Sequence, residues 1–363
     1  MTHIFEIVNE LFAGVVPIAD FLWDFPTNID AYAQIPILGQ LSLAIWLLLG
    51  GSLYFTIRFG FVQVKNFNTG IKLLTSKQEA DVGTSQLAAF LISMGGRVGA
   101  GNIVGVTGAV TIGGPGAIFW MWISAFLGMA TSFGEATLAQ IFKERKNDEY
   151  VGGFTFYIQK IWKNKAWIGV IMCILYLIYN MLSIPVHTFH VFTAVSSIAD
   201  EVTGRITQVT EPLYYVIAIA IIVVIAVIAF GGIKSVAKFS DAIVPIMAGV
   251  YITIVLVLIV LNLGKIPGFI SAVFVGAFKP SAIFGGAFGT AMAQGLKRGL
   301  LSNEAGMGTA TQAAAIADAT HPCEQGFIQS IGVFVDTIVI CSLAGFVVTA
   351  GAIWQNPSID WDV

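Results

Sequence analysis

Two glycine-dense stretches lie inside apolar segments that are long enough to cross a membrane. The first, SMGGRVGAGNIVGV at residues 93–106, belongs to an apolar segment of about 87–112 and contains Arg97 and Asn102. The second, GLKRGLLSNEAGMG at residues 295–308, follows about 200 residues later. A membrane helix can be interrupted only where its freed backbone groups face protein or a wet cavity. Paired interruptions of this kind are typical of solute-binding sites between membrane helices, so these stretches form the predicted site.

The composition places the whole chain in a membrane. Of its 363 residues, 56% are hydrophobic and only 11% are charged, whereas soluble domains average about 25% charged residues. We therefore expect an all-α integral membrane protein. The sequence contains no basic patch for nucleic acid, no metal-ligand spacing of Cys or His, and no catalytic constellation, so neither an enzyme nor a bound cofactor is expected.

The distribution of basic residues predicts the topology. Residues 1–40 lack Lys and Arg, and Phe5–Leu22 is expected to form an amphipathic helix on the membrane. About eight spans are predicted between residues 41 and 354. If residues 1–40 lie outside the cell, the loops 58–84, 143–165 and 231–238 face the cytoplasm, and these loops hold twelve of the eighteen Lys and Arg residues. Such asymmetry supports an extracytoplasmic N-terminus. No linker or composition shift divides the sequence, so a single transmembrane domain is expected over residues 1–363.

The first interruption has the chemistry of a solute site. Glycines at Gly99 and Gly101 leave backbone groups accessible, and Asn102 adds a hard oxygen donor for a cation such as Na⁺. A half-helix N-terminus attracts an anionic carboxylate, while unwound carbonyls suit Na⁺. The alternative is close helix packing, since Gly101 and Gly105 also form a GxxxG pattern. The presence of a second interruption favours the binding interpretation.

Charged and polar residues in the spans divide into candidate ligands and structural residues. Arg97 is predicted either to pair with a carboxylate, to line the cytoplasmic path, or to snorkel from a helix end. Glu135 is interpreted as structural. Arg298 and Glu304 are predicted gate or structural partners. The candidate cation ligands are the oxygen-bearing residues Asn102, Ser302, Asn303, Asp336 and Thr337.

Five blocks of sequence carry a resemblance to a known family. These blocks are GRVGAGNIVGV, GGPGAIFWMW, GMATSFGEATLAQ, RGLLSNEAGMGTA and FVDTIVIC, in this order between Gly96 and Cys341. Together they resemble the alanine or glycine:cation symporters, the sodium:alanine symporter family. The resemblance implies a leucine-transporter-like fold with two inverted repeats and one extra N-terminal helix. It also implies uptake of a small neutral amino acid, driven by Na⁺ or H⁺, across the cell inner (plasma) membrane.

The resemblance places substrate and ion contacts on the first interruption, here Gly99, Ala100, Gly101 and Asn102, and around Gly299–Asn303 at the second. The family often has Thr at the position of Ala100. It also supplies a Gln from the span near 180–189, for which Ser183, Pro185 and His187 are the candidates here. These two departures leave a changed substrate open.

The length of the chain is the third departure from the family. Its members continue further, so the second repeat is expected to be incomplete and the chain to resemble a C-terminally truncated member. Two alternatives to symport therefore remain open at this point: a fragment that does not transport, and an ion channel without a stoichiometric substrate.

Overall fold

The computed structural model describes residues 21, 24–35, 39, 41–76, 83–146, 149–162, 165–204, 211–278 and 287–355. These residues are mostly helical, as expected. The expected amphipathic helix over Phe5–Leu22 lies almost entirely outside the described residues. The first half of the chain contains α3 (Asp30–Ala33), α4 (Leu43–Arg58), α5 (Val62–Lys65), α6 (Phe67–Thr75), α7 (Gln86–Arg97), α8 (Ala100–Gly113), α9 (Gly116–Ile141), β1 (Glu144–Lys146), β2 (Glu149–Val151) and α10 (Phe154–Ile161).

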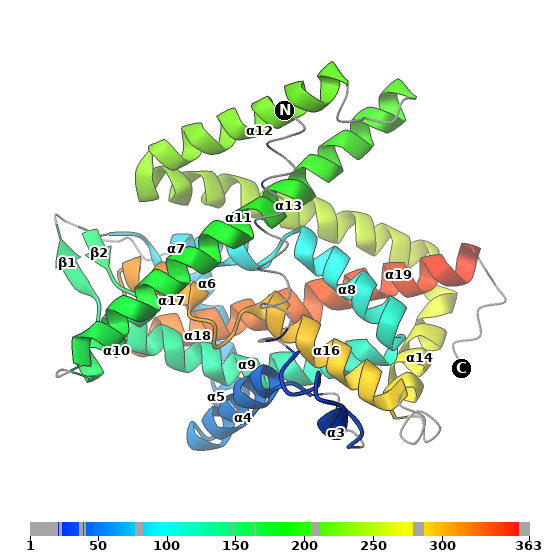
Figure 1. Cartoon of the computed structure of the whole chain (residues 1–363). Helices are drawn as coiled ribbons and strands as arrows, with labels where there is room; N and C mark the ends of the chain where they lie inside the picture. The colour runs from blue at the N-terminus through cyan, green and yellow to red at the C-terminus, as the bar shows by residue number, and fades with distance from the viewer. Residues whose placement is uncertain are drawn as a thin grey trace.

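The second half begins with three long helices and ends with a helix of changing geometry. It contains α11 (Ala166–Thr203), α12 (Pro212–Phe230), α13 (Gly232–Leu261), a 3-10 turn (Leu263–Lys265), α14 (Ile266–Phe278), α16 (Ala287–Asn303), α17 (Thr309–Ile316), α18 (Pro322–Val333), a π-helix (Phe334–Cys341) and α19 (Ser342–Gln355). The helix α18, the π-helix and α19 follow one another without a break and form one long apolar element (Figure 1).

The helix α9 lies at the centre of the bundle. It packs most extensively against α18 and α16, and also contacts α4, α14 and α17. Its buried face is rich in small residues such as Ala125, Gly128 and Ala130, which let neighbouring backbones approach closely. The broken pairs α7–α8 and α16–α17 therefore lie next to the same central helix.

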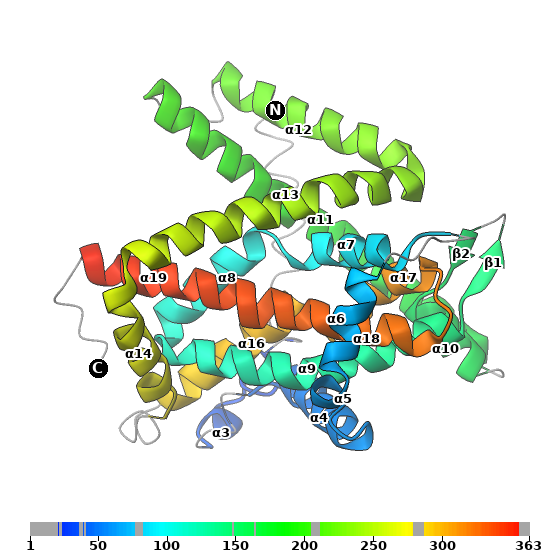
Figure 2. The same ribbon diagram turned by 180° about the vertical axis from the view of Figure 1, so that it is seen from behind.

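The helix α12 stands away from this bundle in both views (Figure 1, Figure 2). Within the described residues it packs mainly on α11 and α13. Its sequence is almost entirely apolar, yet Ile217 is its only buried residue. An apolar helix with exposed side chains suits a lipid surrounding, because the membrane interior is as apolar as the side chains.

Four described helices are long and apolar enough to cross a membrane: Gly116–Ile141, Pro212–Phe230, Lys238–Leu261 and Pro322–Gly351. The bent pair Gln86–Arg97 and Gly101–Gly113 adds a fifth span if the two helices cross the membrane together. Three shorter apolar helices are Leu43–Arg58, Ala166–Met181 and Leu263–Phe278. The chain is thus a multi-pass membrane protein. The number of spans in a bilayer stays a prediction.

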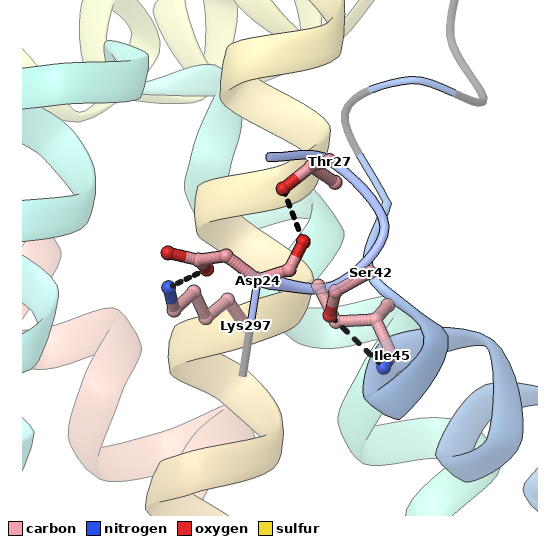
Figure 3. Close-up of polar contacts among 5 residues, drawn as sticks. All are labelled: Asp24, Thr27, Ser42, Ile45 and Lys297. Carbon is pink, nitrogen blue, oxygen red and sulfur yellow. Dashed lines mark hydrogen bonds and ion pairs between the residues drawn. The ribbon is translucent and has the colours of Figure 1, made fainter. Parts of the chain in front are cut away.

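An ion pair fastens the segment before α4 to the helix α16. Lys297 Nζ lies 2.8 Å from Asp24 Oδ1, and the Asp24 backbone carbonyl accepts from Thr27 Oγ1 at 2.5 Å (Figure 3). Ser42 then caps the start of α4 by accepting from the Ile45 amide. The N-terminal segment is consequently attached to the same helix that approaches the second interruption.

Candidate functional site

The first predicted interruption is present between α7 and α8. The helix α7 ends at Arg97, α8 begins at Ala100, and the two axes are bent by 43°. Gly99 has extended backbone and precedes the first turn of α8, where its amide donates to Asn102 Oδ1 at 2.8 Å. Asn102 therefore orders the break with its oxygen and directs its amide nitrogen into the bundle.

The second interruption is also present, at residues 304–308. The helix α16 ends at Asn303 and α17 begins at Thr309. Between them Glu304, Gly306 and Gly308 have positive φ angles of 55°, 86° and 78°. Both glycine-dense stretches are thus broken helices, and the interpretation of the pair as packing motifs alone is wrong.

Gly299 lies before this break, inside α16. A Cβ atom at Gly299 would overlap Ser124 Oγ and lie 3.1 Å from Met121 Cα, both on α9. The glycine is therefore needed for the close approach of α16 to α9, and it does not line the cavity described below. The structure thus gives Gly299 a packing role, and the substrate contact expected there stays a prediction.

Three segments that are distant in sequence meet at a buried polar cluster. Asn102 Nδ2 donates to Asp336 Oδ1 at 2.6 Å and to Ser302 Oγ at 3.0 Å. Ser302 Oγ donates to Asp336 Oδ2 at 2.8 Å, and Thr337 Oγ1 donates to the same oxygen at 2.8 Å. Asn102, Asp336 and Thr337 are at most 1% exposed. Four of the five predicted cation ligands therefore come together at one carboxylate.

Asn303, the fifth predicted ligand, is turned away from the cluster. Its Oδ1 accepts from the Ala305 amide at 3.0 Å, and its Nδ2 is buried without a hydrogen-bond partner next to Gly128 of α9. The side chain of Asn303 thus ends α16 and shapes the break, whereas Ser302, one residue earlier, faces the carboxylate.

Sequence reasoning missed Cys341 as a member of this cluster. Its Sγ lies 3.5 Å from Asn102 Nδ2 and 3.3 Å from Ser302 Oγ. Residues five apart share a face in a π-helix, and such wide turns are frequent at functional sites. Because Asp336 and Cys341 lie five residues apart in the π-helix, both point to the same place. In an α-helix this spacing would separate them, so no local pattern pointed to Cys341.

A cavity of about 560 Å³ borders the two breaks. Its wall contains Gly99 and Gly101 from the first break, Ser183 and His187 from α11, and Ser302 beside the second break. A neighbouring cavity of about 420 Å³ shares Ser183, His187 and Glu304 with it. Four predicted substrate-contact residues, Gly99, Gly101, Ser183 and His187, therefore surround one space. Ala100 begins α8, and its side chain lies outside the described part of the chain.

Arg97 and Arg298 also line the larger cavity, together with Glu304. Arg97 is 4% exposed, and its guanidinium donates to Gln329 and to Ser132 Oγ at 3.2–3.3 Å. A Cβ at Gly332 would overlap the Arg97 guanidinium, so α18 provides a space for it. The snorkelling alternative for Arg97 is wrong, because the side chain is buried within the bundle.

Long apolar helices, two of them broken beside a buried carboxylate and a cavity, define a multi-pass membrane protein of the transporter class. The chain belongs to the sodium:alanine symporter family, which it matches over residues 28–360. This is a family of transporters and not of enzymes.

Three curated relatives are similar over most of this chain. The amino-acid carrier protein AlsT of Bacillus subtilis is 42% identical over 84% of this chain and 63% of its own length. The probable sodium/glutamine symporter GlnT of the same organism is 38% identical over 88% of this chain and 65% of its own length. The putative sodium/proton-dependent alanine carrier protein YrbD, also of B. subtilis, is 36% identical over 87% and 63%, respectively. The chain spans less than two thirds of the length of each of these relatives.

Proposed function

We propose that this protein is a secondary active symporter that couples inward movement of Na⁺ to the uptake of a small neutral amino acid such as alanine or glycine. The observation that carries the proposal is the meeting of Asn102, Ser302 and Asp336, from the two broken helices and the π-helix, beside a cavity. Family membership supports the same class of transport.

The carboxylate of Asp336 is the centre of the proposed Na⁺ site. Na⁺ is a hard cation that takes oxygen ligands, and the cluster offers carboxylate and hydroxyl oxygens from Asp336, Ser302 and Thr337, with the Asn102 amide oxygen close by. In the structure these groups hydrogen-bond to one another. Bound Na⁺ would take the place of the Asn102–Asp336 hydrogen bond and hold the same two segments together.

The cavity beside this cluster is the proposed substrate site. The substrate carboxylate would meet the amides at the start of α8 and the bound Na⁺, because a helix N-terminus attracts anions. Its ammonium group would meet carbonyl oxygens freed by the breaks. Ser183 and His187 of α11 would contact the remainder of the substrate. Ion and substrate then favour the same closed arrangement, and this shared preference is the basis of coupling.

The proposal includes the leucine-transporter-like inverted-repeat fold, with α4 as the extra N-terminal helix and each broken pair opening one repeat. In support, the pair α7–α8 is followed by the long helix α9, which packs against α16 and α17. The pair α16–α17 is followed by the long element that begins with α18, and α18 packs against α9 and α7. The proposal also has the N-terminus outside, on the basis of the basic loops, and the protein in the cell inner membrane, on the basis of the family resemblance.

Uptake of labelled alanine into proteoliposomes tests the proposal. An inward Na⁺ gradient is expected to accelerate uptake over a matched K⁺ gradient, and a panel of unlabelled alanine, glycine and glutamine then ranks the substrates by competition. Uptake that ignores both Na⁺ and H⁺ gradients would overturn the symport assignment. Conductance without saturable uptake would indicate a channel instead.

A further inference from the structure

A second buried carboxylate, Glu135, lies outside the proposed Na⁺ cluster. It lies in the last third of α9, the central membrane-spanning helix, and is 8% exposed. An ionisable side chain at this depth is costly and usually has a function. Glu135 forms none of the contacts around Asp336, so the Na⁺ site does not account for it.

The two oxygens of Glu135 have different surroundings. Oε2 accepts from the Gly308 amide at 3.3 Å, at the start of α17. Oε1 is buried and accepts no hydrogen bond of ordinary geometry, while the Gly306 amide also acts on the carboxyl group. Within the described residues, no cation lies within ion-pairing distance of this carboxyl group. A charged oxygen buried without a partner is unfavourable, so this position calls for a proton or another positive charge.

The electrostatic surroundings of Glu135 are mixed. The groups that act on it or respond to it are Arg97 of α7, Glu304 in the second break, Tyr157 of α10 and Tyr176 of α11. Arg97 is the one cation of this set, and its guanidinium is hydrogen-bonded to Ser132 and Gln329. The buried guanidinium of Arg97 therefore interacts electrostatically with three carboxyl groups, those of Glu135, Glu304 and Asp336.

We propose that Glu135 is a proton-binding site of this transporter, separate from the Na⁺ cluster, which takes up one proton at Oε1 during the transport cycle and releases it to water on the inner side. The inference deepens the proposed symport function and rests on it. The step is a simple protonation: an O–H bond forms on the carboxylate, and the same bond breaks when the proton leaves.

The contact with Gly308 links protonation of Glu135 to the wall of the proposed substrate site. The ionised carboxylate accepts a charge-assisted hydrogen bond from the Gly308 amide and faces the positive end of α17. Protonation weakens both interactions and loosens the hold of α9 on the second break. Thr309, the next residue, lines the cavity of about 420 Å³. Proton binding would therefore alter the wall of that cavity.

The alternative is that Glu135 only caps the start of α17. The variant Glu135→Gln separates the two roles, because glutamine keeps an oxygen that can accept from the Gly308 amide but cannot be ionised. A capping role predicts that Glu135→Gln behaves as the wild type at every pH. A proton-binding role predicts a loss of pH response.

Infrared difference spectroscopy of the purified full chain, stepped from mildly alkaline to mildly acidic pH, tests the site directly. A carbonyl-stretch component of a protonated carboxylic acid is expected in the wild type and lost in Glu135→Gln. This component should persist in Asp336→Asn. In Glu135→Asp it should persist at a shifted frequency, and this variant replaces Glu135→Gln in the test if the glutamine variant fails to fold. An unchanged difference spectrum in Glu135→Gln, or no shift in Glu135→Asp, would overturn the inference.

Uptake measurements add the functional test. In proteoliposomes with a Na⁺ gradient, acidic external pH is expected to change the alanine uptake of the wild type, and this dependence should be lost in Glu135→Gln. A pH dependence that persists in the variant contradicts the inference while leaving symport intact. Absence of any wild-type uptake contradicts the proposed function. The infrared measurement does not depend on uptake and still tests whether Glu135 binds a proton.

Discussion

The side-chain amide of Asn102 donates to Asp336 Oδ1 at 2.6 Å, which links two residues that are 234 positions apart. The same amide reaches Ser302 of α16, so the contact joins both broken helices to the π-helix. Asn102 and Ser302 each come from one broken helix, and the π-helix contributes Asp336 and Thr337. Substitutions in this buried cluster therefore test directly how the three segments are held together.

Replacing Asn102 by Ala is expected to weaken Na⁺ binding by at least about tenfold, or about 1.4 kcal/mol, because it removes the side-chain amide oxygen that is proposed as a Na⁺ ligand near Asp336. The measurement is the rise in Tm of the purified protein on replacing K⁺ by Na⁺, since a ligand that binds the folded state stabilises it. Thr107→Val, on the exposed side of the same helix, is the control. A Na⁺-dependent rise that is the same in Asn102→Ala and wild type would refute the role of Asn102.

Asp336→Asn should abolish Na⁺-dependent stabilisation while retaining much of the fold. Asparagine has nearly the same shape and still accepts from Ser302 or Asn102, but it lacks the charge that holds a cation. Na⁺-driven alanine uptake is expected to fall with it. Retention of the full Na⁺ response in Asp336→Asn would place the ion elsewhere in the bundle.

Gly299→Ala should destabilise the protein by about 1–3 kcal/mol, because the new methyl group has no space between α16 and α9. Thermal unfolding in detergent measures this loss, and Ser124→Gly in the same chain should recover part of it. Gly96→Ala is the matched control, since a Cβ at Gly96 meets nothing within 4 Å. A stable Gly299→Ala variant that has lost only substrate binding would instead support the predicted substrate contact at Gly299.

The ion pair between Lys297 and Asp24 should contribute about 0.2–1 kcal/mol, because the two side chains are 25% and 45% exposed. Lys297→Asp is expected to lower Tm at low salt, and the exchange Asp24→Lys with Lys297→Asp should restore it. High salt should reduce the difference, since exposed charges are screened. Asp30→Asn, an exposed acid of the same segment, serves as the control. An exchange variant no more stable than Lys297→Asp would show that the pair contributes nothing.

The sequence predicted the polar chemistry of the site better than its geometry. Glycine density identified both breaks, and oxygen-bearing side chains in apolar spans identified Asn102, Ser302, Asp336 and Thr337. The second break was expected a few residues too early, because Glu304, a residue that rarely adopts positive φ, forms its first turn. Asn303 was indistinguishable from Ser302 by composition, and only the end of α16 determines which of them faces the carboxylate.

Two further elements could not be predicted from local pattern. The helix α14 has 13 residues, too few for a span, and its apolar character is explained only by its packing on α9 and α16. The hairpin of β1 and β2 lies in a segment whose basic residues indicated only a cytoplasmic loop. There Glu144 pairs with Val151 and Lys146 with Glu149. Both cases depend on contacts between segments and not on the segments themselves.

The wide helical turn over Phe334–Cys341 makes the spacing of this element matter as much as its composition. If this turn tightened to an ordinary α-helix with every residue kept, each residue that the wide turn accommodates in excess would rotate everything beyond it by about 100° relative to Asp336. The composition would not change, yet Cys341 would move away from the carboxylate and Ser342 would lose its partner Trp122. The geometry of this one element is therefore under a constraint that no measure of apolarity can detect.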